Sequence, residues 1–138
     1  MSTLSLTANA PDLERVLIIY TGGTIGMQAS STGLASSGGI DEKVEKALAT
    51  LPIKERQQLP AYDVLSYSTP IDSSAATPMN WQQLAADIHN NLNRYAGFVV
   101  LHGTDTLSWT ASSLAYQLQG LDRPVILTGA MQPLDVAN

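Results

Sequence analysis

The sequence predicts a doubly wound α/β fold, with a mainly parallel sheet in flavodoxin-like order and helices on both faces. Three continuous apolar runs each stop at a short polar segment that contains glycine, and segments with helical periodicity lie between them. Strands that are apolar on both sides are typical of the centre of a parallel sheet, which helices cover on both faces. The alternation of such strands with helices predicts this architecture.

Uninterrupted apolar residues mark the predicted strands. The first strand is expected over residues 16–20, Val-Leu-Ile-Ile-Tyr, and is followed by Thr-Gly-Gly. The second is expected over residues 98–101 and is followed by His-Gly, and the third over residues 125–127, followed by Thr-Gly. A weaker fourth candidate covers residues 62–68. These segments alternate with three predicted helices along the chain.

The segments between the strands carry the period of amphipathic helices. Thr77 can cap a helix that begins at Pro78, because proline is tolerated at the first helical position. Apolar residues then recur at helical spacing at Trp81, Leu84, Ala85, Ile88 and Leu92. A second stripe ends before Gly120, a typical helix stop, and consists of Leu107, Ala111, Leu114, Ala115 and Leu118. A shorter first stripe consists of Val44, Ala47, Leu48 and Leu51.

Two segments are expected to lie outside these layers. Residues 1–12 are rich in serine, threonine and alanine, and we interpret them as a flexible N-terminal arm that precedes a domain over residues 13–138. Residues 28–39 consist mostly of alanine, serine, threonine and glycine, with Leu34 as their one large apolar residue. Because such a segment buries little apolar surface, we expect a mobile loop beside the end of the first strand.

Composition narrows the classes of function. A chain of 138 residues with 44% hydrophobic residues suits one domain with its own core. The net charge of −5, without a basic cluster, argues against nucleic acid as a partner. The absence of cysteine excludes disulfides, thiolate catalysis and zinc–thiolate sites, and neither metal nor organic cofactor is implied. Without a signal-like start or a membrane-length apolar stretch, we expect a cytoplasmic protein with no membrane contact.

Small polar segments follow three of the predicted strands. They read Thr-Gly-Gly-Thr-Ile-Gly over residues 21–26, His-Gly-Thr-Asp-Thr over residues 102–106 and Thr-Gly-Ala-Met over residues 128–131. Open parallel sheets bind ligands at the carboxyl ends of their strands. Taken alone, the first segment could be a tight strand-to-helix turn. Its glycines match neither of the phosphate-binding patterns G-x-x-x-x-G-K-S/T and G-x-G-x-x-G, so a nucleotide-binding domain ranks low among the candidate functions.

Residues 21–26 resemble the first signature of the bacterial L-asparaginases, and residues 102–106 resemble the second. Residues 72–74 and 128–131 fall where this family has substrate-contacting segments, and the resemblance covers residues 16–131. It implies a cytoplasmic, type I-like amidohydrolase that converts L-asparagine to L-aspartate and ammonia through a threonine acyl-enzyme. It also implies a homo-oligomer, and it leaves L-glutamine open as a second substrate.

The resemblance assigns roles to individual residues. Thr24 matches the nucleophile that attacks the side-chain amide carbon of asparagine. Thr104 matches the second catalytic threonine, whose backbone N–H faces the developing oxyanion, and Asp105 matches the aspartate that anchors the α-amino group. Ser73 matches the serine that binds the α-carboxylate, and Ala130 lies near the leaving amide. The matched substrate contacts are Asp72, Ser73, Ser74, Gly103, Thr104, Asp105 and Ala130.

Several of these and neighbouring residues also have a structural interpretation. Thr21 and Thr106 could serve only as helix caps or in local hydrogen bonds. Asp72 could be a turn residue beside Pro70. His102 is interpreted as a strand-end residue with satisfied hydrogen bonds rather than as a base.

The sequence departs from the family pattern in two respects. The tyrosine of the family's mobile loop aligns with Leu34, which cannot donate a hydrogen bond. The family's base-network lysine lies beyond the last strand seen here, whereas Lys43, Lys46 and Lys54 lie in or beside the first helix. The family's C-terminal domain is absent from this sequence. Two alternatives therefore stand beside the amidohydrolase: a catalytically impaired amino-acid-binding domain and an amidotransferase subunit.

Overall fold

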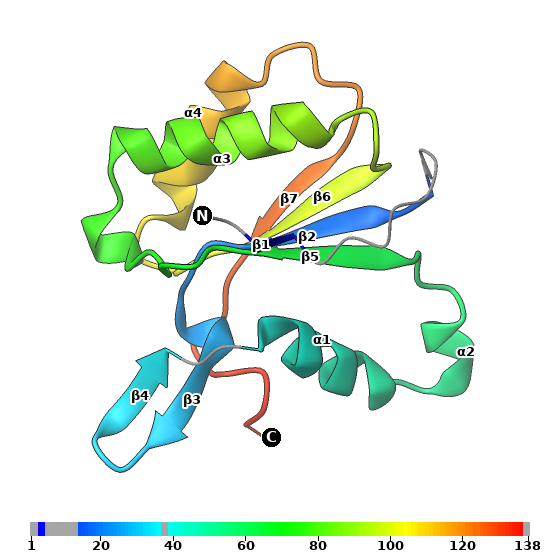
Figure 1. Ribbon diagram of the computed structural model, residues 1–138, viewed down its shortest axis with the longest axis vertical. Helices are drawn as coiled ribbons and strands as arrows, with labels where there is room; N and C mark the ends of the chain where they lie inside the picture. The colour runs from blue at the N-terminus through cyan, green and yellow to red at the C-terminus, as the bar shows by residue number, and fades with distance from the viewer. Residues whose placement is uncertain (1–2, 5–13, 37–38, 137–138) are drawn as a thin grey trace.

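A central sheet lies between two layers of helices (Figure 1). The computed structural model describes residues 3–4, 14–36 and 39–136. Helices α3 and α4 cover one face of the sheet and α1 covers the other, as Figure 1 shows. The helices span Ile40–Ala49 (α1), Ile53–Arg56 (α2), Pro78–Asn91 (α3) and Leu107–Gln117 (α4). The predicted α/β fold with helices on both faces is confirmed.

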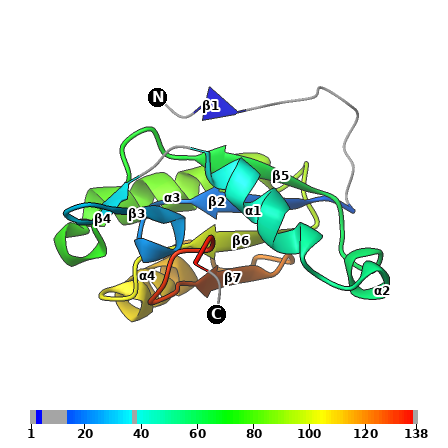
Figure 2. The ribbon, with the colours of Figure 1, turned by 90° about the horizontal axis from the view of Figure 1, so that it is seen from below.

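The sheet has the strand order β1-β5-β2-β6-β7, which can be followed across Figure 2. Its strands span Thr3–Leu4 (β1), Val16–Tyr20 (β2), Tyr62–Ser66 (β5), Gly97–Leu101 (β6) and Val125–Thr128 (β7). Strands β5, β2, β6 and β7 run parallel to one another. Numbered along the chain, these four parallel strands lie in the order second, first, third, fourth, which is the flavodoxin-like order predicted.

The sheet divides the apolar core into two clusters, because successive side chains of a strand point to opposite faces. Leu17 and Ile19 of β2 belong to the cluster beneath α3 and α4, whereas Tyr20 belongs to the cluster against α1. The predicted helical stripes supply the other side of each cluster, with Leu84, Ala85, Ile88 and Leu114 in the first and Val44 in the second. This packing fixes the strand ends relative to one another.

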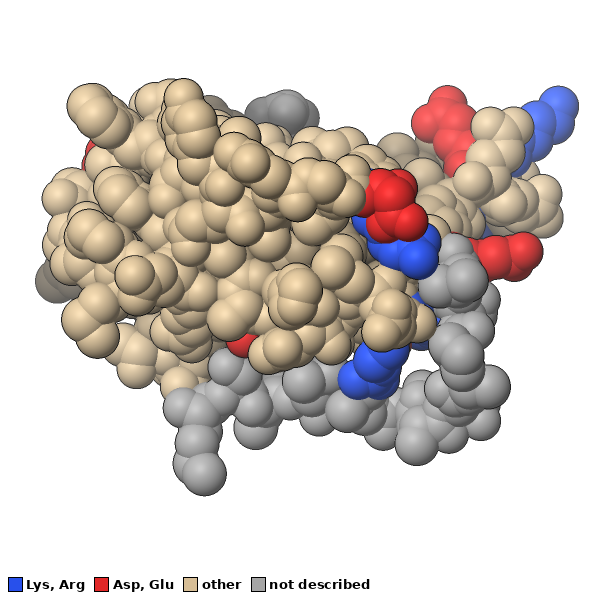
Figure 3. All heavy atoms as spheres, turned by 90° about the horizontal axis from the view of Figure 1, so that it is seen from above, with Lys and Arg blue, Asp and Glu red and all other residues tan. Residues whose placement is uncertain are grey.

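The outward face of α3 and α4 carries few charged side chains (Figure 3). The sequence of α4 contains no Asp, Glu, Lys or Arg, and its Trp109 and Tyr116 are 66% and 78% exposed. Exposed aromatic residues on an uncharged surface are typical of protein interfaces. Within the described residues, no helix is long and apolar enough to span a lipid bilayer.

Residues 27–36 form a β-hairpin, which corrects the expectation of a loop over residues 28–39. Strands β3 (Met27–Ser30) and β4 (Gly33–Ser36) pair antiparallel, and the hydroxyl of Ser30 donates to the carbonyl oxygen of Gly33 at 2.8 Å. Residues 28–35 are exposed. The hairpin is therefore made by backbone pairing that leaves no apolar pattern in the sequence. Residues 37–38 of the expected loop lie outside the described residues.

The expected flexible arm, residues 1–12, is described only at Thr3–Leu4. These residues form β1 and pair antiparallel with Ser66 and Leu65 of β5. They therefore lie against the sheet edge rather than in a loose arm, because β5 offers unpaired backbone groups there. The remaining residues of the arm lie outside the described residues.

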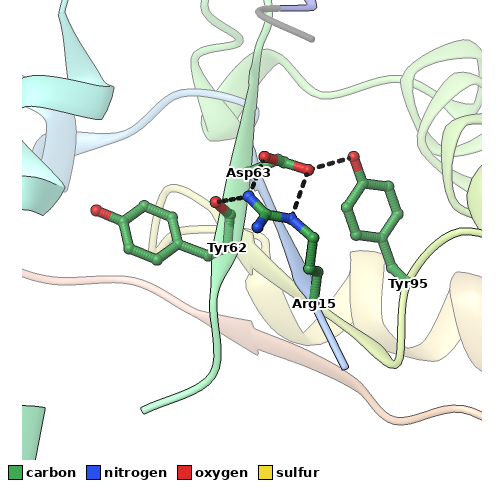
Figure 4. Close-up of polar contacts among 4 residues, drawn as sticks. All are labelled: Arg15, Tyr62, Asp63 and Tyr95. Carbon is green, nitrogen blue, oxygen red and sulfur yellow. Dashed lines mark hydrogen bonds and ion pairs between the residues drawn. The ribbon is translucent and has the colours of Figure 1, made fainter. Parts of the chain in front are cut away.

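A polar network joins the amino ends of two strands (Figure 4). The guanidinium of Arg15 donates to both carboxylate oxygens of Asp63, at 2.7 and 3.3 Å, and to the carbonyl oxygen of Tyr62 at 3.0 Å. The hydroxyl of Tyr95 donates to the same carboxylate at 2.9 Å. The hydrogen bonds from Arg15 hold the pKa of Asp63 below its ordinary value. Burial, and then the bond to Asp63, raise the pKa of Tyr95 to about 12.

We expect Asp63→Asn to destabilise the protein at neutral pH by about 1–2 kcal/mol, because the partly buried guanidinium of Arg15 loses its carboxylate partner. The folded-state pKa of Asp63 is lowered, so its stabilisation is present above the unfolded-state pKa of about 4 and is lost as pH falls below it. Urea unfolding at pH 7 and pH 3 measures this. The difference between wild type and variant should shrink at pH 3, and an unchanged difference would contradict the assignment.

Candidate active site

The segments that follow the parallel strands meet at the carboxyl end of the sheet. The backbone N–H of Thr21 donates to the carbonyl oxygen of Leu101 at 3.0 Å, and that of Ile71 donates to the carbonyl oxygen of Thr21 at 2.7 Å. The backbone N–H of His102 donates to the carbonyl oxygen of Thr128 at 2.9 Å. Backbone hydrogen bonds thus tie all four segments together, as expected for ligand-binding loops of an open parallel sheet.

Two threonine side chains strengthen these connections. The hydroxyl of Thr21 donates to the carbonyl oxygen of Leu101 at 3.0 Å, and that of Thr106 donates to the carbonyl oxygen of Ser73 at 2.7 Å. These bonds join residues that are 80 and 33 positions apart. Thr106 does occupy the N-cap position of α4, but the side chains of Thr21 and Thr106 do not bond locally as interpreted. Sequence reasoning missed their role because only the fold brings their acceptors near.

Glycines let the segments touch backbone to backbone. A Cβ atom on Gly23 would lie 2.6 Å from the Cα and N atoms of Gly103, and one on Gly103 would lie 2.4 Å from the hydroxyl oxygen of Ser73. Gly23 also has a φ of 94°, in the region that favours glycine. The predicted site residues around positions 23, 73 and 103 are thereby brought into one group.

A cleft of about 460 Å³ opens between these segments. It is lined by Gly23, Thr24, Met27, Pro70, Ile71, Asp72, Ser73, Gly103, Thr104, Asp105 and Met131. All the site residues predicted from the sequence line this cleft except Ser74 and Ala130. The side chain of Ser74 is exposed beside the cleft, and Ala130 packs against the core cluster under α1.

Asp72 has the structural role considered for it and also lines the cleft. Its carboxylate accepts hydrogen bonds from the hydroxyl of Ser74 at 2.8 Å and from the backbone N–H of Ser74 at 3.0 Å. These bonds lower the pKa of Asp72 below its ordinary value. Asp72 thereby caps the short helical turn Ser73–Ala75, which carries Ser73 into the wall of the cleft.

Hydroxyl and carboxylate groups dominate the chemistry of the cleft. Within the described part of the chain, the hydroxyls of Thr24 and Ser73 and the carboxylate of Asp105 have no hydrogen-bond partner. Ser73 is only 4% exposed, and the hydroxyl of Thr104 has a weak contact with the sulfur of Met131 at 3.6 Å. These groups are available to a polar ligand. The described residues contain no group of three metal-ligating side chains.

Sequence reasoning missed three apolar lining residues and assigned no role to a fourth, Met131, although it lies in the predicted segment over residues 128–131. Met27, Pro70 and Ile71 flank the predicted motifs, and Met131 follows Ala130. Their positions beside strand ends are the one feature that could have placed them here, because residues next to a strand end share its edge of the sheet.

A lysine on α1 binds the backbone of the turn that carries Thr24. Thr24–Gly26 form a short 3-10 helix, and the ammonium of Lys43 on α1 donates to the carbonyl oxygens of Met27 at 2.7 Å and Gly26 at 3.3 Å. The same ammonium pairs with the carboxylate of Asp135 at 3.4 Å. These three acceptors occupy the three donors of the ammonium, so Lys43 fixes the turn rather than serving as a base.

The structure also confirms the interpretation of His102. Its side chain is buried, at 5% exposure, and both ring nitrogens have hydrogen-bond partners. One partner is the carbonyl oxygen of Gly103 and the other is the hydroxyl of Thr110. His102 is therefore a satisfied strand-end residue, as predicted.

Comparison with known proteins identifies the family of this chain. A family model described as the N-terminal domain of asparaginase matches residues 15–138. The chain belongs to the asparaginase family. It is 43% identical over 121 residues to L-asparaginase 1 of Escherichia coli K12, an alignment that covers 88% of this chain and 35% of that protein. The predicted family resemblance is confirmed.

Two further relatives of this asparaginase domain are a solved asparaginase structure and a protein that has a different name. The solved structure of L-asparaginase I from Vibrio cholerae matches with a TM-score of 0.77 at 41% identity, over 91% of this chain and 36% of that one. The 60 kDa lysophospholipase of mouse is 38% identical over 138 residues, covering 88% of this chain and 24% of that protein. The chain thus spans about a quarter to a third of the length of its curated relatives.

The turn of Thr24 in this asparaginase domain has a tyrosine partner, although Leu34 stands at the loop position where the family pattern predicts a tyrosine. Leu34, which is predicted to stand in place of the family's loop tyrosine, lies on β4 and is 50% exposed. A different tyrosine supports the turn: the hydroxyl of Tyr20 on β2 donates to the carbonyl oxygen of Gly23 at 3.3 Å. Burial raises the pKa of Tyr20. Tyr20 holds the backbone before Thr24 rather than the hydroxyl of Thr24.

Proposed function

We propose that this chain is the nucleophile-bearing part of an amidohydrolase that converts L-asparagine to L-aspartate and ammonia. The observation that supports this proposal is the shared cleft, in which Thr24 lies with Thr104 and Asp105 although the two segments are about 80 residues apart in sequence. A threonine nucleophile needs a second polar group within reach, and Thr104 and Asp105 line the same cleft as Thr24.

In the proposed reaction, the hydroxyl oxygen of Thr24 forms a bond to the side-chain amide carbon, and the carbon–nitrogen bond breaks. The hydroxyl proton leaves with the nitrogen as ammonia, and water then releases L-aspartate from the threonine ester. Thr104 serves this step with its hydroxyl, which orients the water, and with its backbone N–H, which faces the developing oxyanion. A donor aimed at such an oxyanion contributes about 3–4 kcal/mol.

Two dissimilar anchors are proposed to orient the substrate. The carboxylate of Asp105 binds the α-ammonium group, and the hydroxyl of Ser73 binds the α-carboxylate. Both residues line the cleft, and their side chains lack hydrogen-bond partners among the described residues. Each can therefore bind its end of the substrate without breaking an existing hydrogen bond. Anchoring both ends of the amino acid places its amide at Thr24 and lowers the entropic part of the barrier.

A catalytically impaired amino-acid-binding domain is the second candidate. Two observations favour it. The hydroxyl of Thr24 has no basic partner within the described residues, and the three donors of the Lys43 ammonium are all engaged by other acceptors. The homo-oligomeric state stays a prediction, which the exposed Trp109 and Tyr116 on the uncharged α4 surface support. The amidotransferase alternative, the cytoplasmic location and the use of L-glutamine also stay predictions.

We expect Asp105→Asn to weaken L-aspartate binding by about 30- to 100-fold, because the neutral amide cannot balance the charge of the ammonium group. Calorimetry with the purified chain measures this. Asp122→Asn is the matched control, since Asp122 is 82% exposed in the turn before β7 and should leave affinity unchanged. Equal affinity of wild type and Asp105→Asn would contradict the assigned anchor.

Ammonia release from L-asparagine distinguishes the two candidate functions. Release by the wild-type chain, at a rate that falls in Asp105→Asn, supports the amidohydrolase. Binding of L-aspartate by a folded chain that releases no ammonia supports the impaired binding domain. Hydrolysis of a lysophospholipid in place of asparagine would overturn both candidates.

A further inference from the structure

His102 lies in a chain of hydrogen bonds that begins inside the helical layer and ends at the cleft. The indole N–H of Trp81 on α3 donates to the hydroxyl oxygen of Thr110 on α4 at 2.9 Å. That hydroxyl lies 2.9 Å from Nε2 of His102, and Nδ1 of His102 lies 2.6 Å from the carbonyl oxygen of Gly103. His102 and Thr110 are 5% and 1% exposed, so water does not compete for these bonds.

The direction of each bond follows from the donors and acceptors available. A carbonyl oxygen only accepts, so Nδ1 of His102 must be protonated and must donate the hydrogen bond to the carbonyl oxygen of Gly103. In the neutral ring Nε2 then has a lone pair, which accepts the proton of the Thr110 hydroxyl. The oxygen of that hydroxyl in turn accepts the indole N–H of Trp81, which is a donor only. The network therefore selects the Nδ1–H tautomer of His102.

This tautomer holds one peptide group at the wall of the cleft. The described residues contain no cis peptide bond, so the C=O of Gly103 and the N–H of Thr104 point in opposite directions from one planar group. The C=O is bound to the buried ring of His102, whereas Gly103 and Thr104 both line the cleft. Fixing the C=O on the buried side thus fixes the direction of the N–H on the other side.

We propose that His102 is a positioning residue, which sets the direction of the Thr104 backbone N–H through the hydrogen bond from Nδ1 to the carbonyl oxygen of Gly103. This inference rests on the proposed function, in which that N–H faces the oxyanion. Thr110 and Trp81 act through His102 by maintaining its tautomer. His102 itself does not exchange protons with substrate, because the lone pair and the proton of its ring are both engaged.

Two substitutions at position 102 separate positioning from packing. The side-chain nitrogen of asparagine can occupy the place of Nδ1 and keep the bond to Gly103, whereas that of glutamine matches Nε2 and keeps only the bond to Thr110. We expect His102→Asn to retain kcat within about threefold. His102→Gln should lower kcat by about tenfold with KM within twofold, because the oxyanion donor is misdirected rather than removed.

The opposite order of the two variants would overturn the proposal. Glutamine is closer to histidine in volume, so a purely structural role predicts that His102→Gln retains more activity than His102→Asn. A rise in KM with unchanged kcat in His102→Gln would also overturn it, since an oxyanion donor acts on the transition state. Urea unfolding of both variants confirms that folded protein is compared.

A measurement on the wild-type chain tests the inference apart from turnover. Nitrogen-15 NMR of the imidazole at pH 7 should show a protonated Nδ1 and an unprotonated Nε2 for His102. In Thr110→Val the ring should lose this single tautomer, and the amide resonance of Thr104 should shift. A protonated Nε2 in the wild type, or an unmoved Thr104 amide in Thr110→Val, would overturn the inference. If the spectra are as expected but no ammonia is released, the result would contradict the amidohydrolase proposal and leave the positioning role of His102 standing.

Discussion

Replacing Thr24 with alanine should lower ammonia release from L-asparagine by at least about 10³-fold, because the hydroxyl that forms the acyl bond is gone. Thr24 begins the 3-10 turn in the wall of the cleft, and its hydroxyl has no structural partner within the described residues. Loss of the hydroxyl should therefore leave folding and L-aspartate binding within a few-fold of wild type. A coupled ammonia assay and calorimetry on the same preparation measure both quantities.

Two further variants make this result specific. Thr24→Ser keeps the hydroxyl and should retain measurable turnover, whereas Thr32→Ala removes an exposed hydroxyl in the hairpin turn and should change nothing. If Thr24→Ala releases ammonia at the wild-type rate, Thr24 is not the nucleophile. The remaining threonine in the cleft, Thr104, then becomes the candidate, and Thr104→Ala tests it.

Replacing Gly23 with alanine should destabilise the fold by about 2–5 kcal/mol. The left-handed φ of 94° costs an alanine about 1–2 kcal/mol, and overpacking adds about 1–3 kcal/mol. The overpacking arises because the new methyl group would lie 2.6 Å from backbone atoms of Gly103, which cannot rotate away as a side chain could. Since Gly23 and Gly103 both line the cleft, ammonia release should be lost even where the protein folds.

Gly120→Ala is the matched control for this prediction. Gly120 also has a positive φ, of 77°, but a Cβ there would meet nothing within 4 Å. The strain remains and the clash is absent, so the expected loss is about 1–2 kcal/mol. Urea unfolding of the two variants beside wild type measures the difference. Equal losses at the two positions would show that the two loops do not pack as closely as described.

Most of the fold is encoded in local patterns of the sequence. The run over residues 16–20 is apolar on both faces, and this alone predicted the central strand β2. The stripe that begins at Trp81 predicted the helix whose Leu84 and Ile88 are buried in the core. The hairpin over residues 27–36 escaped prediction, because its strands pair through backbone groups and bury no apolar face.

Hydrophobic periodicity predicts the fold class, and the resemblance of short motifs to a known family names the polar residues that meet at the carboxyl end of the sheet, since both are local properties of the sequence. The tertiary structure alone decided how those residues are held. Lys43 meets the turn of Thr24, and His102 meets Gly103 and Thr110, because packed helices bring donors to acceptors. Hydrogen bonds of this kind depend on distance and direction between elements, and no local pattern in the chain encodes either.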